Sequence, residues 1–255
     1  EDWDVTTNAK PEEVQKIFPE NFYENKFFTV TVRTGSDNPK LKEIEVTTFR
    51  SDHKYTDRRR PGEVRYAKTL QEDLSRRDFT VNAIALRGSE VIDPFEGRKD
   101  LKARVIRAVG EPKARFQEDA LRMMRAARLA TVLNFAIEGK TKKAIQGQSS
   151  LLREISEERV RDEFLKIIMA DHAMKGIELL HELELLRHIV PELEEGYGVE
   201  QNKHHKYTVW EHNVYSLDYA AKQKWNSSVR IASLLHDVAK PRVKQGTGPN
   251  ATFYN

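Results

Sequence analysis

The hydrophobic pattern of this sequence changes its period along the chain. Two runs near the amino terminus, 27–33 and 43–50, alternate apolar and polar residues, as half-buried β-strands do. From Ala114 onward the apolar residues recur at helical spacing instead. This change predicts an α+β fold, in which the strands form a small amino-terminal sheet and the remainder is helical. Helices are predicted over 114–134, from Ser156 onward, and near 173–186, 209–223 and 227–239.

The segment between the two patterns carries turn and cap signals. Residues 51–74 are polar and basic, and they predict a surface loop. Ser75 is predicted to cap a helix that continues to Leu86. Arginines in the first turn of that helix would oppose its dipole, which favours a bound anion nearby. Residues 91–94 are expected to form a short strand that leads into a turn.

The composition limits the classes of protein to which the chain can belong. Charged residues make up 33% of it and its mean hydropathy is −0.69, so we expect several small cores and much hydrated surface. The absence of cysteine excludes disulfides, and no apolar run is long enough to span a membrane, so a cytoplasmic protein is expected. The net charge is only +3, but clustered arginines suit phosphate contact. The clusters are Arg58–Arg60, Arg76–Arg77, and Arg122 with Arg125 and Arg128.

Three acids in the amino-terminal part form a candidate metal site. Asp2 and Asp4 are spaced so that a strand would place both carboxylates on one face. Glu45 lies between Ile44 and Val46 in the second strand run, and would be a third acid on a neighbouring strand. Grouped carboxylates repel one another unless a cation joins them, and Mg²⁺ prefers such oxygen ligands. The pattern predicts a magnesium site, with ordinary solvated surface acids as the alternative.

Several segments, taken in order along the chain, resemble the motifs of a known enzyme family. They are Asp2–Ala9 with Pro11–Val14, Glu43–Arg50, Tyr55 with Arg59–Pro61 and Val64, Glu72–Ala83, Asp93–Gly97 with Asp100–Leu101, and Arg115–Arg122. The family is that of the template-independent RNA nucleotidyltransferases, which comprises tRNA CCA-adding enzymes and bacterial poly(A) polymerases. The resemblance covers roughly residues 1–170.

The resemblance implies a division into three parts. These are a nucleotidyltransferase head over 1–110, a helical neck with a base-reading motif over 111–170, and a helical body over 171–255 that ends in a partial HD-like domain.

The sequence departs from the family pattern in two places. The family's glycine-rich phosphate-binding turn, with its Arg-Asp pair, should precede Asp2 and is not in this sequence, and Phe28-Thr29 stands where the family often has Gly-Thr. We therefore expect the chain to be a piece that is cut at both ends.

The resemblance also implies an activity, the addition of CMP and AMP from CTP and ATP to the 3′ end of tRNA. Asp2, Asp4 and Glu45 would be the catalytic acids, and Asp2 and Asp4 would bind Mg²⁺. In a two-metal scheme, one ion activates the RNA 3′-hydroxyl and the other steadies the leaving pyrophosphate. Addition of A alone and poly(A) synthesis stay open as alternatives, although the amino-acid sequence of residues 73–80 resembles the tRNA enzymes more closely.

A second set of residues is expected to bind the nucleotide. Asp119 and Arg122 are three residues apart and would be neighbours on a helix. A carboxylate accepts hydrogen bonds and a guanidinium donates them, which matches the pairing edges of cytosine and adenine but not those of uracil and guanine. The alternative is an ordinary surface ion pair. By resemblance, the other members of the set are Arg77, Asp78 and Asn82 at the ribose and phosphates, and Arg125 and Arg128, which would contact the nucleotide or the Asp119–Arg122 pair.

A third set of residues lies near the carboxyl end. His236 and Asp237 resemble the core of an HD metal-phosphohydrolase domain, and His212 lies where such a domain has its first histidine ligand. These ligand types suit a divalent metal, so a second metal site that hydrolyses phosphoesters is an alternative function. A lone His-Asp dipeptide is commonly structural, and no later aspartate of an HD module is evident. A non-catalytic RNA-binding fragment is the remaining hypothesis.

Overall fold

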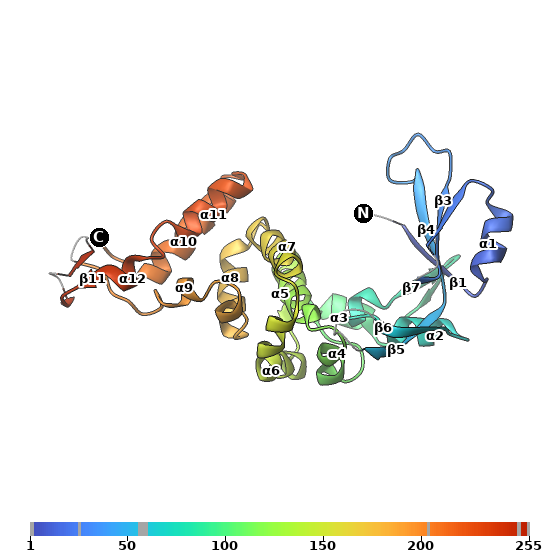
Figure 1. Ribbon diagram of the computed structural model, residues 1–255, viewed down its shortest axis with the longest axis horizontal. Helices are drawn as coiled ribbons and strands as arrows, with labels where there is room; N and C mark the ends of the chain where they lie inside the picture. Colours follow the sequence, from blue (N-terminus) through green and yellow to red (C-terminus); the bar gives the residue numbers. More distant parts are fainter. Residues whose placement is uncertain (1–2, 25–26, 56–60, 203–204, 249–250, 254–255) are drawn as a thin grey trace. The chain divides into compact units, whose positions relative to one another are not determined.

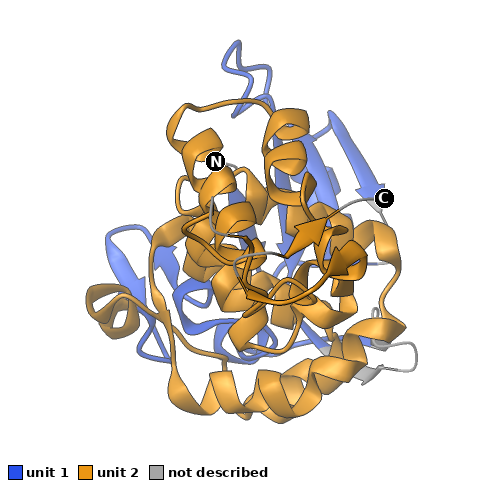
Figure 2. Cartoon of the chain, turned by 90° about the vertical axis from the view of Figure 1, so that its left-hand side faces the viewer, with its two compact units in different colours: residues 1–97 blue, residues 98–255 orange. Residues whose placement is uncertain are grey.

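The computed structural model contains a small amino-terminal sheet and a larger helical part, which confirms the predicted α+β class (Figure 1). The chain divides into two compact units, residues 1–97 and 98–255 (Figure 2). The three-part division expected from the sequence stays a prediction. Among the residues described, no helix combines the length and the apolar character that crossing a bilayer requires. The structure describes residues 3–24, 27–55, 61–202, 205–248 and 251–253.

Four strands form the main sheet of the first unit, in the order β1-β4-β3-β2. β1 pairs in parallel with β4, and the other neighbours are antiparallel. The bounds of the strands are β1 Asp4–Thr7, β2 Asn21–Glu24, β3 Thr29–Arg33 and β4 Glu43–Thr48. β3 and β4 lie within the two runs whose alternation predicted strands, which confirms that prediction.

Alternation divides the side chains of this sheet between two unlike faces. Val30, Val32 and Val46 lie on one face and are buried. Helix α1 (Pro11–Ile17) covers that face and contributes Val14 to the same core. Burial of each such side chain stabilises the fold by about 1.5–3 kcal/mol. The residues that alternate with the valines are polar, so the opposite face of the sheet can carry the candidate acids.

The prediction of a surface loop over 51–74 is wrong for most of its length. β5 (Arg50–Tyr55) pairs antiparallel with β6 (Pro61–Tyr66), and α2 (Leu70–Ser75) follows. The hydrophobic pattern missed this hairpin because its strands lack apolar alternation, which backbone hydrogen bonding does not require. Residues 56–60, which hold the first arginine cluster, lie outside the described residues.

The predicted helix from Ser75 to Leu86 is also wrong, because Ser75 ends a helix instead of starting one. The hydroxyl of Thr69 caps α2 by accepting a 3.2 Å hydrogen bond from the backbone N–H of Glu72. Arg76 therefore lies at the carboxyl end of α2, where a cation is favourable to the helix dipole. After α2 come the 3-10 turn Thr80–Asn82 and the hairpin of β7 (Ala85–Arg87) and β8 (Glu90–Ile92).

The 3-10 turn that carries Asn82 is packed tightly against the start of helix α3 (Gly97–Ala103). A Cβ at Gly97 would lie 2.2 Å from the carbonyl oxygen of Thr80, so only glycine fits there without a backbone shift. The backbone N–H of Gly97 also donates a 2.7 Å hydrogen bond to the carboxylate of Asp93. Both contacts lie within the first unit and hold the turn in place.

The second unit is mainly helical, and α5 packs against α7 and α8, while α10 packs against α8 and α11. Its helices are α3 (Gly97–Ala103), α4 (Pro112–Glu118), α5 (Leu121–Leu133), α6 (Gly139–Gln148), α7 (Glu157–Ile168), α8 (Ala173–Glu182), α9 (Pro191–Glu194), α10 (Val209–Lys222), α11 (Ser227–Leu235) and α12 (Lys240–Val243). Short pieces complete it: β9 (Val105–Ile106) with β10 (Ala136–Ile137), β11 (Lys244–Gln245) with β12 (Thr252–Phe253), and the 3-10 turns Ser149–Glu154 and Leu186–His188. The helices predicted after Ser156 are confirmed, although the last of them ends at Leu235.

The predicted helix over 114–134 is interrupted at Asp119. This residue has an extended backbone, with φ −145° and ψ 106°, between α4 and α5. Its carboxylate accepts a 3.0 Å hydrogen bond from the backbone N–H of Leu121, which satisfies one of the first donors of α5. The interruption places Asp119 at the start of a helix, where an acid is favourable to the helix dipole.

Candidate active site

Two acids of the polar sheet face lie side by side on neighbouring strands. Asp4 of β1 and Glu45 of β4 are register partners in the parallel pair, so both side chains leave the same face. Adjacent strands lie about 4.8 Å apart, which brings the two carboxylates within reach of one cation. Both residues are exposed, and neither makes an ion pair or side-chain hydrogen bond with any residue that the structure describes. Asp2, the third predicted acid, lies outside the described residues.

The chemistry of this donor set suits Mg²⁺. Carboxylate oxygens are the hard ligands that the ion prefers, and it commonly keeps waters or phosphate oxygens at its other positions. Two neighbouring acids without a basic partner in the described part of the chain repel each other, and a bound cation relieves that repulsion. The residues present therefore fit a divalent cation at Asp4 and Glu45.

A buried acid next to this face was missed by the sequence analysis. Asp73 of α2 has no exposed surface. Its carboxylate accepts hydrogen bonds from the hydroxyl of Thr6 at 3.4 Å, from the backbone N–H of Arg50 at 3.1 Å, and from the guanidinium of Arg76 at 3.0 and 3.1 Å. The only signal in the sequence is the arginine three residues later on the same helix, which predicts one of these contacts but not the other two.

Arg77, Asp78 and Asn82 follow α2 in one short segment. The side-chain amide of Asn82 donates a 3.1 Å hydrogen bond to the buried carboxylate of Asp78, so these two predicted residues are in contact. The same carboxylate oxygen accepts from the backbone N–H of Phe79 at 2.9 Å. The Nε atom of Arg77 is buried and has no hydrogen-bond acceptor among the described residues. A buried guanidinium nitrogen without a partner is suited to an anionic ligand.

The side chains of Asp119 and Arg122 are bound to other residues, while the backbone N–H of Arg122 donates a 3.1 Å hydrogen bond to the carbonyl oxygen of Asp119. Arg159 of α7 donates a 3.0 Å hydrogen bond to Asp119 Oδ2. Arg122 donates a 2.8 Å hydrogen bond to the carboxylate of Glu118, which also forms an ion pair with Arg115. Both outer partners were missed by the sequence analysis. Glu118 adjoins Asp119 in the motif, but nothing in the spacing links Arg159 to it across 40 positions.

The two remaining arginines of this motif lie on α5. Arg128 is partly buried, and its Nε lies 2.6 Å from a carboxylate oxygen of Glu163 on α7. Glu163 is itself buried and also pairs with Lys166 at 2.9 Å. Arg128 therefore ties α5 to α7, and Arg125 is partly exposed on the same helix. These contacts make Arg128 part of the packing that supports Arg159.

His212, His236 and Asp237 come together near the carboxyl end, from α10 and from the end of α11. One ligand atom from each lies within 4.8 Å of the others. The Nε2 atoms of the two histidines are 3.0 Å apart, and each is 3.4 Å from Oδ2 of Asp237. The Nδ1 atom of His236 lies 2.9 Å from the carbonyl oxygen of Ser233, which fixes the ring orientation.

Two further features bear on metal binding at this cluster. Burial lowers the pKa of His212, against the opposing effect of Asp237, and so favours the neutral imidazole that metals require. Lys240 Nζ lies 2.7 Å from Asp237 Oδ2 and supplies a positive charge at the same carboxylate. A metal ion at this cluster therefore has to share Asp237 with a lysine.

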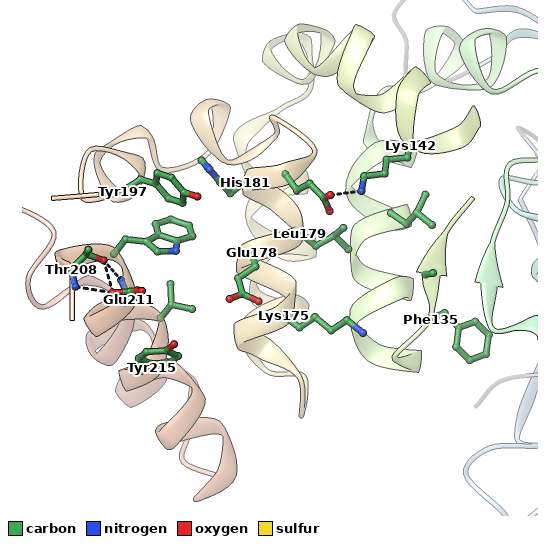
Figure 3. Close-up of a pocket in the computed structure, with 16 residues that line it drawn as sticks. Phe135, Lys142, Lys175, Glu178, Leu179, His181, Tyr197, Thr208, Glu211 and Tyr215 are labelled. Atoms are coloured by element: carbon green, nitrogen blue, oxygen red, sulfur yellow. Dashed lines mark hydrogen bonds and ion pairs between the residues drawn. The ribbon is translucent and has the colours of Figure 1, made fainter. Parts of the chain in front are cut away.

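A groove between α8 and α10 has a volume of about 780 Å³ (Figure 3). Aromatic side chains line it, among them Tyr197 and Tyr215, and none of the residues singled out in the sequence analysis does so. Its charged lining consists of Lys142, Lys175, Glu178, Glu182 and Glu211. Because acids outnumber bases, the groove is unsuited to a triphosphate, and it does not replace the candidate site on the sheet.

Comparison with protein-family models matches two parts of the chain. Residues 1–107 match the family described as "Poly A polymerase head domain". Residues 134–196 match the family described as "Probable RNA and SrmB- binding site of polymerase A". The first match includes every described candidate residue of the sheet and of the segment after α2.

Comparison with individual proteins finds similar sequences and structures among enzymes that act on tRNA. A CCA-adding enzyme of Lactobacillus helveticus is 44% identical over 186 residues, which are 72% of this chain and 45% of that protein. The structure of the Bacillus stearothermophilus CCA-adding enzyme in complex with CTP matches with a TM-score of 0.68 at 34% identity, over 95% of this chain and 62% of that one. A tRNA nucleotidyltransferase complexed with a primer tRNA and an incoming ATP analog matches with a TM-score of 0.65 at 26% identity, over 93% and 68%. This chain thus spans less than half the length of the curated relative.

Proposed function

The chain belongs to the family of tRNA CCA-adding enzymes and bacterial poly(A) polymerases, and we propose that it carries the catalytic part of a CCA-adding enzyme. Its reaction is the addition of CMP and AMP, from CTP and ATP, to the 3′ end of tRNA. The observation that carries the proposal is the Asp4–Glu45 pair, two adjacent acids without a basic partner in the described structure, on the polar face of a family head domain.

The acids of the sheet hold the metal in this proposal. Asp4 and Glu45, with Asp2 from the same motif, bind Mg²⁺ through carboxylate oxygens. These acids would hold a Mg²⁺ ion that would supply two effects, a lower pKa for the RNA 3′-hydroxyl and a positive charge to offset that of the leaving pyrophosphate. The protein's own contribution is to hold the carboxylates of Asp4 and Glu45 close together on neighbouring strands, so that the reacting oxygens are positioned before the reaction begins.

The segment after α2 binds the sugar and the phosphates. Asp78 and Asn82 are already joined by a hydrogen bond, and together they offer an acceptor and a donor to ribose hydroxyls. Arg77 supplies positive charge to the triphosphate, and its buried Nε without a described acceptor supports this role.

Asp119 and Arg122 choose the base. A carboxylate has about four lone-pair sites, so Asp119 can keep its bonds to Leu121 and Arg159 and still accept from the amino group of cytosine or adenine. Glu118 orients Arg122, which donates to the neighbouring ring nitrogen. Uracil and guanine present the reversed pattern and leave polar groups unpaired, at about 1–3 kcal/mol for each. Arg125 and Arg128 support this helix and add positive charge beside it.

A primer-extension assay tests the proposal against its closest alternatives. The full-length protein is given each NTP separately with tRNA that ends at the discriminator base, in C, or in CC. We expect CMP to be added to the first two and AMP to the third, with UMP and GMP rejected in all cases. Addition of AMP only, and only after CC, would mean an A-adding enzyme. Extension of unstructured RNA with ATP alone would mean a poly(A) polymerase.

A cytoplasmic location, where tRNA and nucleotides are available together, is part of the same proposal.

The histidine cluster supports a second candidate function of another class. His212, His236 and Asp237 offer two imidazoles and a carboxylate within 4.8 Å, a donor set that suits Mn²⁺ or a similar divalent ion. Such a site is able to hydrolyse phosphoesters, and RNA 2′,3′-cyclic phosphate is the substrate that we propose to try.

The two activities can be separated with single substitutions. Hydrolysis of a 2′,3′-cyclic phosphate in the presence of Mn²⁺ should survive Asp4→Ala and be lost in His236→Ala, because only the second change removes a ligand of the cluster. His172→Ala, at an exposed histidine before α8, is the matched control and should retain hydrolysis. If His236→Ala hydrolyses the substrate at the wild-type rate, this candidate function is wrong, whatever the result for nucleotide addition.

A further inference from the structure

Strand β1, which carries Asp4, is attached to the rest of the sheet along one edge. Among the described strands it pairs only with β4. It is also short, Asp4–Thr7, so few backbone hydrogen bonds fix it in place. A strand of this kind can shift relative to its neighbour, and any shift changes the distance between the carboxylates of Asp4 and Glu45. The position of these two metal ligands therefore depends on contacts outside the strand pair.

The buried carboxylate of Asp73 makes such contacts on both strands. Its Oδ2 accepts from the hydroxyl of Thr6, which lies two residues after Asp4 and on the same face of β1. Its Oδ1 accepts from the backbone N–H of Arg50, two residues beyond the end of β4. One carboxylate with no exposed surface thus holds the strand of Asp4 and the continuation of the strand of Glu45 together.

The contact with Arg76 places a positive charge beside this buried carboxylate. The guanidinium donates two hydrogen bonds to Oδ1, at 3.0 and 3.1 Å, and both groups lie on or beside α2. A carboxylate that is paired with a guanidinium can also accept hydrogen bonds from neutral donors through its remaining lone pairs. An ordinary helix-end ion pair would need only Arg76. The bonds to Thr6 and Arg50 are additional, and they point toward the acid pair.

We propose that Asp73 is a positioning residue for the metal site, which sets the separation of Asp4 and Glu45 by clamping β1 to the start of β5. The proposal rests on the proposed function, because it takes the acid pair to bind a divalent cation. Asp73 itself is buried and does not contact the ion. Groups that orient metal ligands from outside typically change metal affinity by about 10- to 100-fold when they are replaced.

The test measures metal binding directly and needs no catalysis. Mn²⁺ is titrated into the full-length protein and the free ion is followed by electron paramagnetic resonance, in a His236→Ala background so that the histidine cluster does not contribute. Asp73→Asn keeps the size of the side chain and removes its charge. We expect the dissociation constant for Mn²⁺ to rise about 10- to 100-fold, with an unchanged number of sites. Thermal unfolding of the same samples reports whether the variant is folded.

A pair of threonine variants separates positioning from general stability. Thr6→Val removes only the hydroxyl that donates to Asp73, and we expect a smaller weakening of Mn²⁺ binding, about two- to tenfold. Thr47→Val is the matched control, because Thr47 is the register partner of Thr6 and its hydroxyl bonds to Thr29 instead. It should leave the dissociation constant unchanged. If Asp73→Asn does not fold, this pair still decides the question.

The outcomes distinguish the proposal from the function on which it rests. If Asp4→Asn binds Mn²⁺ as tightly as the parent protein, the acid pair is not the metal site and the proposed function fails. If Asp4→Asn weakens binding but folded Asp73→Asn and Thr6→Val do not, the metal site stands and the positioning role is wrong. Equal weakening by Thr6→Val and Thr47→Val would also overturn the positioning role.

Discussion

Asp4→Ala should abolish nucleotide addition while leaving tRNA binding nearly unchanged. The substitution removes one of the two neighbouring carboxylates of the proposed metal site, and metal-based stabilisation of a transition state amounts to several kcal/mol. A loss of about 4 kcal/mol corresponds to a fall in kcat of about 1,000-fold. Primer extension with CTP under single-turnover conditions measures the rate, and a filter-binding or gel-shift titration with the same tRNA measures binding.

An acid elsewhere in the first unit provides the control for this experiment. Asp37 lies in the exposed turn between β3 and β4, and Asp37→Ala changes the net charge by the same amount as Asp4→Ala. It should retain the parent rate. If Asp4→Ala still incorporates CMP within about tenfold of the parent rate, Asp4 does not hold the catalytic metal. A parallel loss of tRNA affinity in both variants would indicate an effect of charge alone.

Asp119→Ala should relax the choice of base more than it weakens nucleotide binding. In the proposed mechanism UTP and GTP are rejected because their pairing edges would leave polar groups of the protein unsatisfied, at about 1–3 kcal/mol for each group. Removal of the carboxylate deletes one of those groups, so discrimination of CTP against UTP should fall about 10- to 100-fold. The ratio of kcat/KM for the two nucleotides is the measurement. The Michaelis constant for CTP should change less, because the proposed contact of Asp119 is with the base and not with the phosphates.

The controls for Asp119→Ala come from α7. Arg159→Ala removes the partner of Asp119 and should also reduce discrimination, although by less, because the acceptor itself remains. Asp162→Ala removes an exposed acid on the same helix, paired with Arg161, and should leave base choice unchanged. If Asp119→Ala keeps the parent preference for C over U, the base is chosen by other groups, and the pairing-edge argument is wrong.

The sequence predicted the parts of the fold that have a hydrophobic period. β3 and β4 were predictable because valines alternate with polar residues, and α7, α8 and α10 because apolar residues recur at helical spacing. The β5–β6 hairpin was not, because its backbone pairing leaves no apolar alternation in the sequence. The role of Ser75 was mistaken for another reason. A serine can end a helix as well as start one, and it is the cap formed by Thr69 that shows Ser75 to be at the end of α2.

The candidate site was predictable to the level of motifs but not of contacts. The spacing of Asp2 and Asp4 and the resemblance of Glu43–Arg50 identified the acids, yet the register that pairs Asp4 with Glu45 comes from the fold. Asp119 and Arg122 were expected to be neighbours that face the base, because they were placed on one continuous helix. The interruption at Asp119 turns its carboxylate to Arg159, a residue 40 positions away, which no local spacing can indicate. Long-range partners of this kind require coordinates.

Metal binding by Asp4 and Glu45 is tested most sharply by locating a bound ion in the crystal. Crystals of the full-length protein with Mn²⁺ and CTP, measured at the manganese absorption edge, give that position by anomalous diffraction. We predict a peak about 2.1 Å from carboxylate oxygens of both Asp4 and Glu45. Density for bound CTP, with no manganese at these two acids, would contradict the account.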